Sequence, residues 1–493
     1  MPSWGTEAWR AAGTINRGMD RLNQAIGSAV TASGVRPGRH ARRSGVLGPD
    51  DPPPSDARST YWDFRYVLLP KQVRALAQGT FPLGTVIHPQ RRGPEFPIYL
   101  EWGNLEKHTA IIGPPGSGKS RLLIAPWIVQ ATVNGLTTIN VDVKGDLAES
   151  IRDAKRTLGA KGTLRVRRWD IGAPEKSRSW NPISEVRSVQ DASQVAQALL
   201  GPVDPSSAHK FFEERDHRWL RGLLRVLAAQ PGGPPHPREL YRVAVSQDYL
   251  KQYLTGGGVQ THDVLDMVQL PKSDYSAATA GLTNRLSWLA DPTFEKMLSG
   301  TGPDAITVDE ILTSGGIFVV GARLSHGELA WASSSMLLSL LKLRTMERFG
   351  SLATPILWTL DEAGRYGDRI NLQEMLDVLR GAGSSVCIAI QDVQHLGDEK
   401  KAIATLASCD TVITLKGVSP ATAKMIGDRL GHVSAPVVTQ SAGPNGAWQP
   451  SVSHQLQPML GQAEIMNLPM TNRGALAHLR SASAVPLVID LEP

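Results

Sequence analysis

A glycine-rich segment that ends in lysine and serine has the composition of a phosphate-binding loop. It fits the pattern G-x-x-x-x-G-K-[ST]. Glycines let the backbone curl so that its N–H groups point at phosphate oxygens. We expect Lys119 to reach the β- and γ-phosphates of ATP and the Ser120 hydroxyl to bind Mg²⁺. The predicted nucleotide-binding residues of this loop are Gly113, Pro114, Pro115, Gly116, Ser117, Gly118, Lys119 and Ser120.

Two adjacent carboxylates further along the chain supply the second half of a hydrolytic site. Asp361 and Glu362 follow the apolar stretch Ile356–Leu360. We expect Asp361 to hold the Mg²⁺ shell through water, opposite Ser120, and Glu362 to orient and polarise the attacking water. Kinases that move phosphate to a small acceptor do not generally need the second acid, so the pair favours hydrolysis. The alternative is an acidic helix cap.

Three further polar residues follow apolar strands. Gln391 comes after SVCIAI, where it can sense the γ-phosphate beside Glu362, although strand ends also carry ordinary polar residues. Asp142 and Lys144 lie in VDVKGD at the end of the strand predicted for residues 137–143. Since ligands of parallel sheets bind at the carboxyl ends of strands, we expect Asp142 and Lys144 to contact the nucleotide or an adjacent subunit.

The elements that position these residues alternate between strand and helix. Residues 109–112 read as a strand, and residues 121–130 as a helix interrupted at Pro126. From about residue 60 to 190 and again after residue 305, the pattern predicts parallel α/β structure. The fold class is therefore α/β, a P-loop nucleotide-binding domain with a mainly parallel central sheet. GALAHLRSASAVPLVIDL completes the sheet, and the Gln-, Ser-, Pro- and Gly-rich residues 434–457 are predicted to be a loop.

Between the two α/β parts, the periodicity is helical. Asp361 follows Ser120 by 241 positions (361 − 120), whereas one βαβ unit takes roughly 30 residues, so the two halves of the site bracket several strands and a helical insertion. We place domain limits at 1–58, 59–190, 191–300 for the inserted all-α domain, and 301–493. We assign three aromatic residues of the inserted domain, Phe211, Phe212 and Trp219, to its core rather than to a base-stacking surface.

Composition sets limits on the class of protein. The chain has 493 residues, 41% hydrophobic and 20% charged, which is typical of two or three globular domains. The net charge of +6 and the pI near 9.3 are compatible with a polyanionic partner but do not require one. Cys387 and Cys409 cannot form a metal cluster or a disulfide framework. Their apolar neighbours predict core positions in a cytosolic protein.

The N-terminal segment differs from the rest of the chain. Residues 1–58 are rich in arginine, place apolar residues on one helical face and end in a Pro-rich linker. They form either a helix packed on the body with a solvated tether, or a basic amphipathic segment that docks on a membrane surface or a membrane-bound partner. No apolar run approaches the roughly 18 to 20 residues that span a bilayer, and no signal peptide is apparent.

Taken in order, the motifs resemble those of the coupling proteins of type IV secretion and conjugation. The similarity covers about residues 105–480 and is far more specific than the glycine-rich loop alone. The segments that carry it are KHTAIIGPPGSGKS, VDVKGDL, WNPIS, HKFFEERDHRWLRGLL, LWTLDEAGRYG, RGAGSSVCIAIQDVQHL and CDTVITLKGVSPATAKMIGDRLG.

The resemblance implies a RecA-like ATPase domain that uses ATP and Mg²⁺ and carries an inserted all-α domain. Such proteins form hexameric rings at the membrane, receive a relaxase–DNA complex and drive single-stranded DNA into the secretion channel. The family's nucleotide loop corresponds to residues 113–120 and its acidic pair to Asp361 and Glu362. Its glutamine corresponds to Gln391, and its second-strand motif to Asp142 and Lys144. The expected partners are DNA bound without sequence preference, a relaxase, secretion components and further copies of the chain.

The N-terminus departs from the family pattern, because most members carry N-terminal transmembrane helices and none is predicted here. We expect a cytoplasmic protein recruited to the cytoplasmic face of the membrane through residues 1–58, or a partner that supplies the membrane segment. In a ring, a cation from the neighbouring subunit stabilises transition-state charge. Arg380 in VLRGAG is our candidate for that role and Arg365 the second, the alternative being a surface or DNA-facing arginine.

Two other functions fit the same motifs. One is a motor that pumps duplex DNA in chromosome segregation or repair, which the helical insertion disfavours. The other is a receptor that recruits secreted proteins and uses nucleotide only to assemble its ring. DNA-stimulated ATP hydrolysis distinguishes the receptor from the motors, and a comparison of single-stranded with duplex DNA distinguishes the two motors.

Overall fold

The computed structural model describes residues 79–87, 94–256, 262–349, 354–442, 448–468, 473–481 and 486–491. The predictions made for residues 1–58 lie outside the described residues. The chain divides into two compact units, residues 1–61 and residues 62–493, and the description below concerns the second. No helix in the described part of the chain is both long and apolar enough to cross a bilayer.

An 11-stranded sheet forms the centre of this unit, in the order β2-β1-β13-β12-β9-β3-β8-β7-β4-β6-β5. Every neighbouring pair from β9 to β5 is parallel, as predicted. The strands of this parallel part are β3 (Thr109–Ile112), β4 (Thr137–Asp142), β5 (Val166–Asp170), β6 (Gly316–Gly321), β7 (Ile356–Asp361), β8 (Ser384–Ile390) and β9 (Thr411–Leu415).

The other end of the sheet is antiparallel, which the sequence did not predict. It consists of β1 (Phe81–Ile87), β2 (Pro94–Leu100), β12 (Gly474–Leu479) and β13 (Leu487–Asp490). Here β12 pairs with β9, β13 pairs with β12, and the β1–β2 hairpin pairs with β13. Strands from both ends of the described chain therefore lie side by side.

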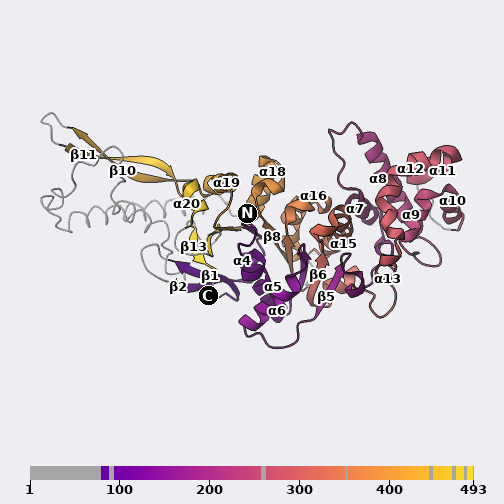
Figure 1. Ribbon diagram of the computed structural model, residues 1–493, viewed down its shortest axis with the longest axis horizontal. Coiled ribbons are helices and arrows are strands. Elements are labelled where there is room, and N and C mark those ends of the chain that lie inside the picture. The colour runs from indigo at the N-terminus through magenta and orange to yellow at the C-terminus, as the bar shows by residue number, and fades with distance from the viewer. Residues whose placement is uncertain are drawn as a thin grey trace, which may run out of the picture. The chain divides into compact units, whose positions relative to one another are not determined.

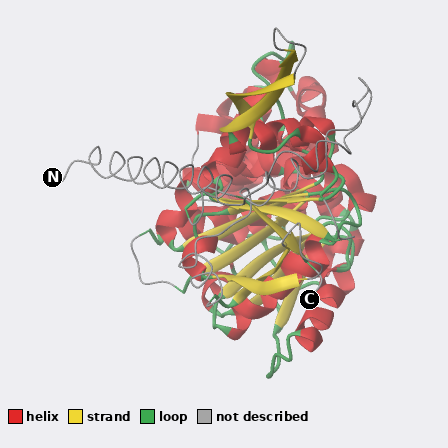
Figure 2. Ribbon diagram, turned by 90° about the vertical axis from the view of Figure 1, so that its left-hand side faces the viewer, coloured by secondary structure: helices red, strands yellow, loops and turns green. Residues whose placement is uncertain are grey.

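Helices cover both faces of the sheet, as Figures 1 and 2 show. Successive strand residues enter different cores: Ala110 and Ile112 belong to one, and Ile111 to the other. Helices α5 (Ala125–Val133) and α6 (Leu147–Thr157) cover the second core. Since both faces are buried, the parallel strands are apolar throughout. Both cysteines are free and buried, as predicted.

Helices predominate between β5 and β6. Helix α7 (Val189–Leu200) packs along α15 (Gly327–Glu347) on the sheet. The helices that follow gather beyond the β5 edge (Figure 1). They are α8 (Lys210–Ala228), α9 (Arg238–Val245), α10 (Gln247–Gly256), α11 (Leu265–Gln269), α12 (Lys272–Leu286) and α13 (Glu295–Leu298). We call α8–α13 the helix block.

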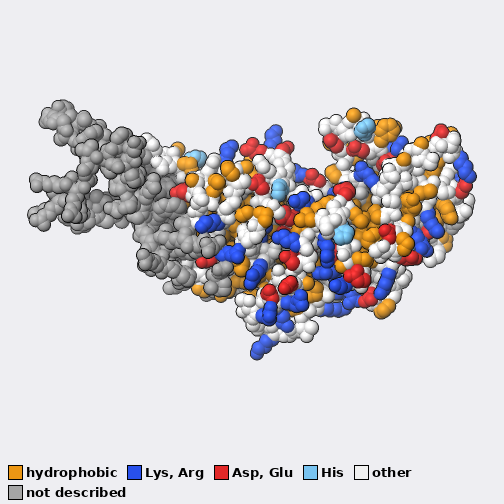
Figure 3. Space-filling view, in the orientation of Figure 1, with side chains coloured by type: hydrophobic (Ala, Val, Ile, Leu, Met, Phe, Trp, Pro, Cys, Tyr) orange, Lys and Arg blue, Asp and Glu red, His pale blue; other side chains and the backbone are white. Residues whose placement is uncertain are grey.

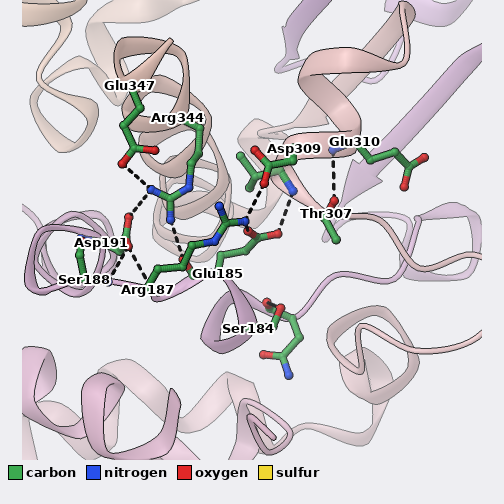
Figure 4. Close-up of polar contacts among 12 residues, drawn as sticks. Ser184, Glu185, Arg187, Ser188, Asp191, Thr307, Asp309, Glu310, Arg344 and Glu347 are labelled. Atoms are coloured by element: carbon green, nitrogen blue, oxygen red, sulfur yellow. Dashed lines mark hydrogen bonds and ion pairs between the residues drawn. The ribbon is translucent and has the colours of Figure 1, made fainter. Parts of the chain in front are cut away.

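Buried charges fasten the start of α7 to the sheet domain, as Figure 4 shows. The Asp191 carboxylate lies 2.8 Å from the Arg344 guanidinium, and both side chains are buried. Burial opposes ionisation of Asp191, but hydrogen bonds from Arg344, Arg187 and Ser188 hold its pKa below the ordinary value. Arg344 also donates to the Glu185 carbonyl at 2.9 Å. The N-terminal end of α7 is thus attached to α15.

The prediction of a loop at residues 434–457 is wrong. Strands β10 (His432–Ala442) and β11 (Trp448–Pro458) form an antiparallel two-stranded ribbon paired from end to end (Figure 1). Proline normally argues against a strand because it lacks the N–H of the ladder. In a two-stranded ribbon each strand has a free outer edge, so Pro436 and Pro450 are tolerated there.

Two of the three aromatic residues assigned to the core are not buried. Trp219 is buried in α8, as expected. Phe211 and Phe212, in the first turn of the same helix, are 73% and 51% exposed. The helical period alone could not separate them from Trp219, because the first turn of α8 extends past the helices that cover its later turns.

Candidate active site

The predicted site residues converge because of the strand order. Strands β3, β8, β7 and β4 are consecutive and parallel, so their carboxyl ends lie along one edge. This edge carries, in order, the glycine-rich loop after β3, Gln391 after β8, Asp361 and Glu362 at the end of β7, and Asp142 at the end of β4. Residues up to 278 positions apart in sequence (391 − 113) are thereby brought together.

The glycine-rich loop has the conformation that its glycines allow. Gly116 and Gly118 have φ of +74° and +98°, in the region where other residues are strained. At Gly113 the constraint is space, since a Cβ there would lie 2.8 Å from Leu415 Cβ. Pro114 is partly buried and Pro115 is exposed. The loop therefore exposes its backbone at the end of β3.

Lys119 is buried under the loop. Its ammonium group donates to the carbonyl of Gly113 and, at 3.3 Å, to that of Pro114. Burial lowers the pKa of Lys119, and the carboxylates of Glu362 and Asp361 act in the opposite direction. The lysine charge therefore lies between the loop and the acidic strand end. Ser120 follows it in the first helical turn, partly buried.

The helix after the loop is not interrupted at Pro126, contrary to our prediction. It begins as a π-helix, η1 (Lys119–Ile124), in which the Ala125 N–H bonds to the Ser120 carbonyl five residues back. It continues as α5, with Pro126 in the first turn of the α-helical part. The missing N–H of proline falls where the hydrogen-bond register changes, so the helix does not break.

Asp361 and Glu362 are both buried at the end of β7. Burial raises the pKa of Asp361 to about 6; Lys144 opposes this rise and Glu362 adds to it. The Tyr366 hydroxyl donates to the Asp361 carbonyl at 3.1 Å and so holds the strand end. Asp361 is thus an acid whose ionised form a nearby cation would stabilise.

Glu362 has a strained backbone conformation, and its two carboxylate oxygens differ in their hydrogen bonding. Its φ of +50° is in the left-handed region, a strain often found at functional sites. Oε1 accepts a hydrogen bond from Gln391 Nε2 at 2.7 Å. Oε2 is buried and has no partner among the described residues. Gln391 therefore lies beside Glu362, as we predicted, and the other oxygen can accept a proton.

Asp142 and Lys144 differ in their surroundings. Asp142 is buried, and its carboxylate accepts from the backbone N–H of Lys144 at 3.2 Å, Gly145 at 2.7 Å and Leu147 at 3.3 Å. Burial raises its pKa, while the Gly145 bond lowers it. Asp142 thus shapes the turn that presents the exposed Lys144 to the site, rather than facing the site itself.

A cavity of about 840 Å³ adjoins the outer side of the loop. It is bordered by loop residues that include Lys119 and Ser120, by Lys144, and by Tyr99 of the β1–β2 hairpin. Arg473, just before β12, also lines it and donates to the Gly116 carbonyl at 2.9 Å. Sequence reasoning missed Arg473 and the hairpin, because neither carries a motif and antiparallel pairing brings them here from the two ends of the chain.

The two arginines proposed for a role between subunits lie at opposite ends of the parallel strands. Arg365 is exposed in η8 (Ala363–Arg365), directly after Glu362. Arg380 is exposed in η9 (Leu379–Ala382), which precedes β8. Since Gln391 follows the other end of that strand, Arg380 and Gln391 are separated by its whole length, roughly 20 Å for seven residues. Arg380 therefore does not belong to the site of its own chain.

Comparisons with known proteins agree with this geometry. Residues 96–490 match the type IV secretion-system coupling protein DNA-binding domain. Among solved structures, the fold is similar to that of the bacterial conjugative coupling protein TrwBdeltaN70, with a TM-score of 0.63 and 19% identity over 87% of this chain and 92% of that one. TrwB in complex with ADP and Mg²⁺ gives the same TM-score at 18% identity, covering 87% and 93%.

A more distant similarity is to VirB4 of Thermoanaerobacter pseudethanolicus, with a TM-score of 0.50 and 14% identity over 84% of this chain and 97% of that one. No curated protein matches the sequence. The likeness to TrwB confirms the predicted fold, a P-loop nucleotide-binding domain with a large, mostly parallel sheet and an all-α part.

Proposed function

This chain belongs to the family of type IV secretion-system coupling proteins, and we propose that it is an ATPase that drives single-stranded DNA into a secretion channel. The observation that carries the proposal is the joint placement of the phosphate loop, Gln391 and the Asp361–Glu362 pair on three neighbouring strands. Nucleotide complexes of TrwB, with ADP and Mg²⁺ and with a non-hydrolysable ATP analogue, support nucleotide binding at this loop.

ATP binding follows from the loop. Its backbone N–H groups and the start of the helix at Lys119 suit the triphosphate. The ammonium group of Lys119 exchanges its contacts with the Gly113 and Pro114 carbonyls for phosphate oxygens. The cavity between the loop and the β1–β2 hairpin receives the nucleoside, and Arg473 keeps the loop apex in place.

Ser120 and Asp361 are the residues that would hold Mg²⁺. A hydroxyl and a carboxylate are oxygen ligands of the kind this ion prefers, and because burial raises the pKa of Asp361, a bound cation would stabilise its ionised form. When bound, Mg²⁺ neutralises charge that develops on the phosphates. Lys144, at the same edge, adds a positive charge toward Asp361.

Glu362 acts as the general base. Its Oε2, which is buried and has no partner among the described residues, accepts the proton of the attacking water, while Gln391 fixes Oε1 and with it the direction of the carboxylate. Burial keeps other water away from the carboxylate. Since Arg380 is remote from its own site, we propose that it stabilises transition-state charge in the next subunit of a hexameric ring.

We propose further that the chain works in the cytoplasm, at the membrane face, where residues 1–58 dock on a membrane-bound partner. A relaxase–DNA complex is the proposed cargo, and secretion components are the proposed partners. A positively charged lumen would hold DNA through its phosphates. In Figure 3, Lys, Arg, Asp and Glu side chains are mixed over the visible face, so no single-sign stripe on that face marks a lumen.

A comparison of binding with turnover tests the proposed site. A fluorescent ATP analogue should bind the wild type and Glu362→Gln with similar affinity, and Lys119→Ala much more weakly. ATP hydrolysis should fall about 10²-fold or more in Glu362→Gln, since general-base catalysis contributes on the order of 10² to 10⁴. Full hydrolysis by Glu362→Gln would show that another group acts as the base.

A further inference from the structure

The first turn of α8 carries two aromatic side chains on the surface of the helix block. Phe211 and Phe212 are exposed, whereas the apolar residues of the later turns, such as Trp219 and Leu223, are buried. In the orientation of Figure 1, hydrophobic side chains reach the surface at the upper end of this helix (Figure 3). Neither ring contributes to the ATPase site, so their exposure has no explanation in the function proposed above.

The ring of Phe212 packs against the side chain of Arg215. The Arg215 guanidinium lies 5.1 Å from the Phe212 ring centroid and 4.4 Å from that of Trp219. Arg215 is itself fixed by hydrogen bonds of 2.9 Å to Asp216 and to the Ala278 carbonyl. The ring thus rests on a cation that connects it to the buried part of the helix, and little side-chain freedom is left to lose on binding.

Phe211 extends the same surface. Its ring centroid is 5.7 Å from that of Phe212, and the planes meet at 78°. The two exposed rings present π-faces in two directions. A flat apolar ligand can stack on either one without any rearrangement of the helix.

The charges around the pair are balanced. Lys210 lies 3.6 Å from Glu214. Glu213 accepts from the Asp204 N–H at 3.2 Å and from the Ser207 hydroxyl at 2.9 Å. These contacts leave no excess of positive charge to attract phosphate, so a ligand of this surface is recognised through the ring faces.

We propose that Phe211 and Phe212, which lie within the residues that match the DNA-binding domain family, form a base-stacking platform for single-stranded DNA. The inference rests on the proposed function, in which single-stranded DNA is the cargo. Unpaired bases present apolar faces that stack on aromatic side chains regardless of sequence, whereas bases inside a duplex already stack on each other. The platform holds the strand by its bases while basic residues elsewhere hold its phosphates.

Binding of labelled oligonucleotides to the full-length chain tests the platform. The probes are a mixed-sequence single strand, an abasic strand of equal length and the duplex. Phe211→Ala and Phe212→Ala should each weaken binding of the mixed-sequence strand about tenfold, within the range measured for base–aromatic stacking. Phe349→Ala, which removes another exposed phenylalanine two residues beyond the end of α15, should bind as the wild type.

The salt dependence and the abasic probe separate stacking from charge. The slope of log affinity against log salt should be the same for all variants, because no phosphate contact is removed. The abasic strand should bind the wild type and both variants equally. A loss of affinity for the abasic strand as large as that for the base-bearing strand would overturn the proposal.

Two outcomes distinguish failure of the platform from failure of the proposed function. If both variants bind the mixed-sequence strand as tightly as the wild type, and this strand still stimulates ATP hydrolysis, the function stands and the platform is wrong. The pair would then serve a protein partner. If single-stranded DNA neither binds nor stimulates the wild type, the proposed function itself fails, and the platform fails with it.

Discussion

At the level of single residues, the two oxygens of Glu362 have different surroundings. One is occupied by Gln391 at 2.7 Å and the other is buried without a partner among the described residues. The acidic pair and the glutamine could be predicted from the sequence, because each follows an apolar strand. The strained backbone at Glu362 and the capping role of Asp142 could not be predicted, since both depend on the exact turn after the strand.

Gln391 should matter for turnover rather than for ATP binding. In Gln391→Ala the Glu362 carboxylate loses the hydrogen bond that directs it, and misplacement of a catalytic group costs about 10²-fold in rate. Steady-state hydrolysis should fall by about that factor, with the affinity for a non-hydrolysable ATP analogue unchanged. Gln394→Ala, an exposed neighbour in the same segment, is the control and should behave as the wild type. Equal hydrolysis by both variants would mean that Gln391 does not direct Glu362.

Asp361 should make stability depend on pH. Its pKa in the folded chain is about 6, above the ordinary 3.8, so the folded state binds the proton more tightly than the unfolded state. Its contribution to stability is therefore full below pH 3.8 and is lost as the pH rises toward 6. A pKa of about 6 in place of 3.8 corresponds to up to about 3 kcal/mol.

Asp361→Asn removes this titration. Without Mg²⁺, the variant should gain stability relative to the wild type as the pH rises from 4 to 6, measured by chemical unfolding. Mg²⁺ binding by the wild type in the presence of ADP should weaken below about pH 6, because protonated Asp361 is a poor ligand. A stability difference that does not change across this interval would contradict the raised pKa.

At the scale of elements, the parallel strand order places the site, and the antiparallel additions enlarge it. The alternation of strands and helices predicted parallel strands, but not their order. It could not predict the antiparallel strands, because β13 pairs with β1 across almost the whole chain. The ribbon at residues 432–458 was missed because its composition is that of a loop. Phe211 and Phe212 were misassigned because helical spacing does not show where the covering helices end.

The buried Asp191–Arg344 pair should be a strong point of attachment for α7. Asp191→Ala leaves the buried Arg344 guanidinium with only the more exposed Glu347 carboxylate, at 2.8 Å, and should cost about 3 kcal/mol. Lys272→Ala breaks an exposed pair with Asp248 and should cost much less. Thermal unfolding followed by circular dichroism measures both. Similar melting temperatures for the two variants would show that burial does not increase the contribution of the ion pair to stability.

At the level of the whole molecule, Arg380 and the candidate site of the same chain lie at opposite ends of strand β8. A chain with this geometry needs a second copy if Arg380 is to take part in hydrolysis. Heterologous contacts close into rings where the rotation between subunits allows it, and each subunit of such a ring can complete the site of its neighbour. The sequence made the arginine a candidate, and the strand direction places it away from the site of its own chain.

Mixed rings test the role of Arg380 between subunits. Arg380→Ala and Glu362→Gln should each be inactive alone, because every site lacks one component. Equal mixtures should regain up to about a quarter of wild-type hydrolysis, since in a randomly mixed ring about one interface in four pairs an intact Glu362 with an intact Arg380. A mixture that stays as inactive as its components would contradict a role of Arg380 between subunits, and full hydrolysis by Arg380→Ala alone would place Arg380 outside the mechanism.

Steady-state ATP hydrolysis at low salt is the first measurement to make, without DNA, with single-stranded DNA and with duplex DNA. Single-stranded DNA should stimulate hydrolysis by the wild type, duplex DNA should stimulate it less, and both responses should vanish in Glu362→Gln. A wild type that binds ATP and shows no response to single-stranded DNA would rule out the DNA motor and favour a substrate receptor.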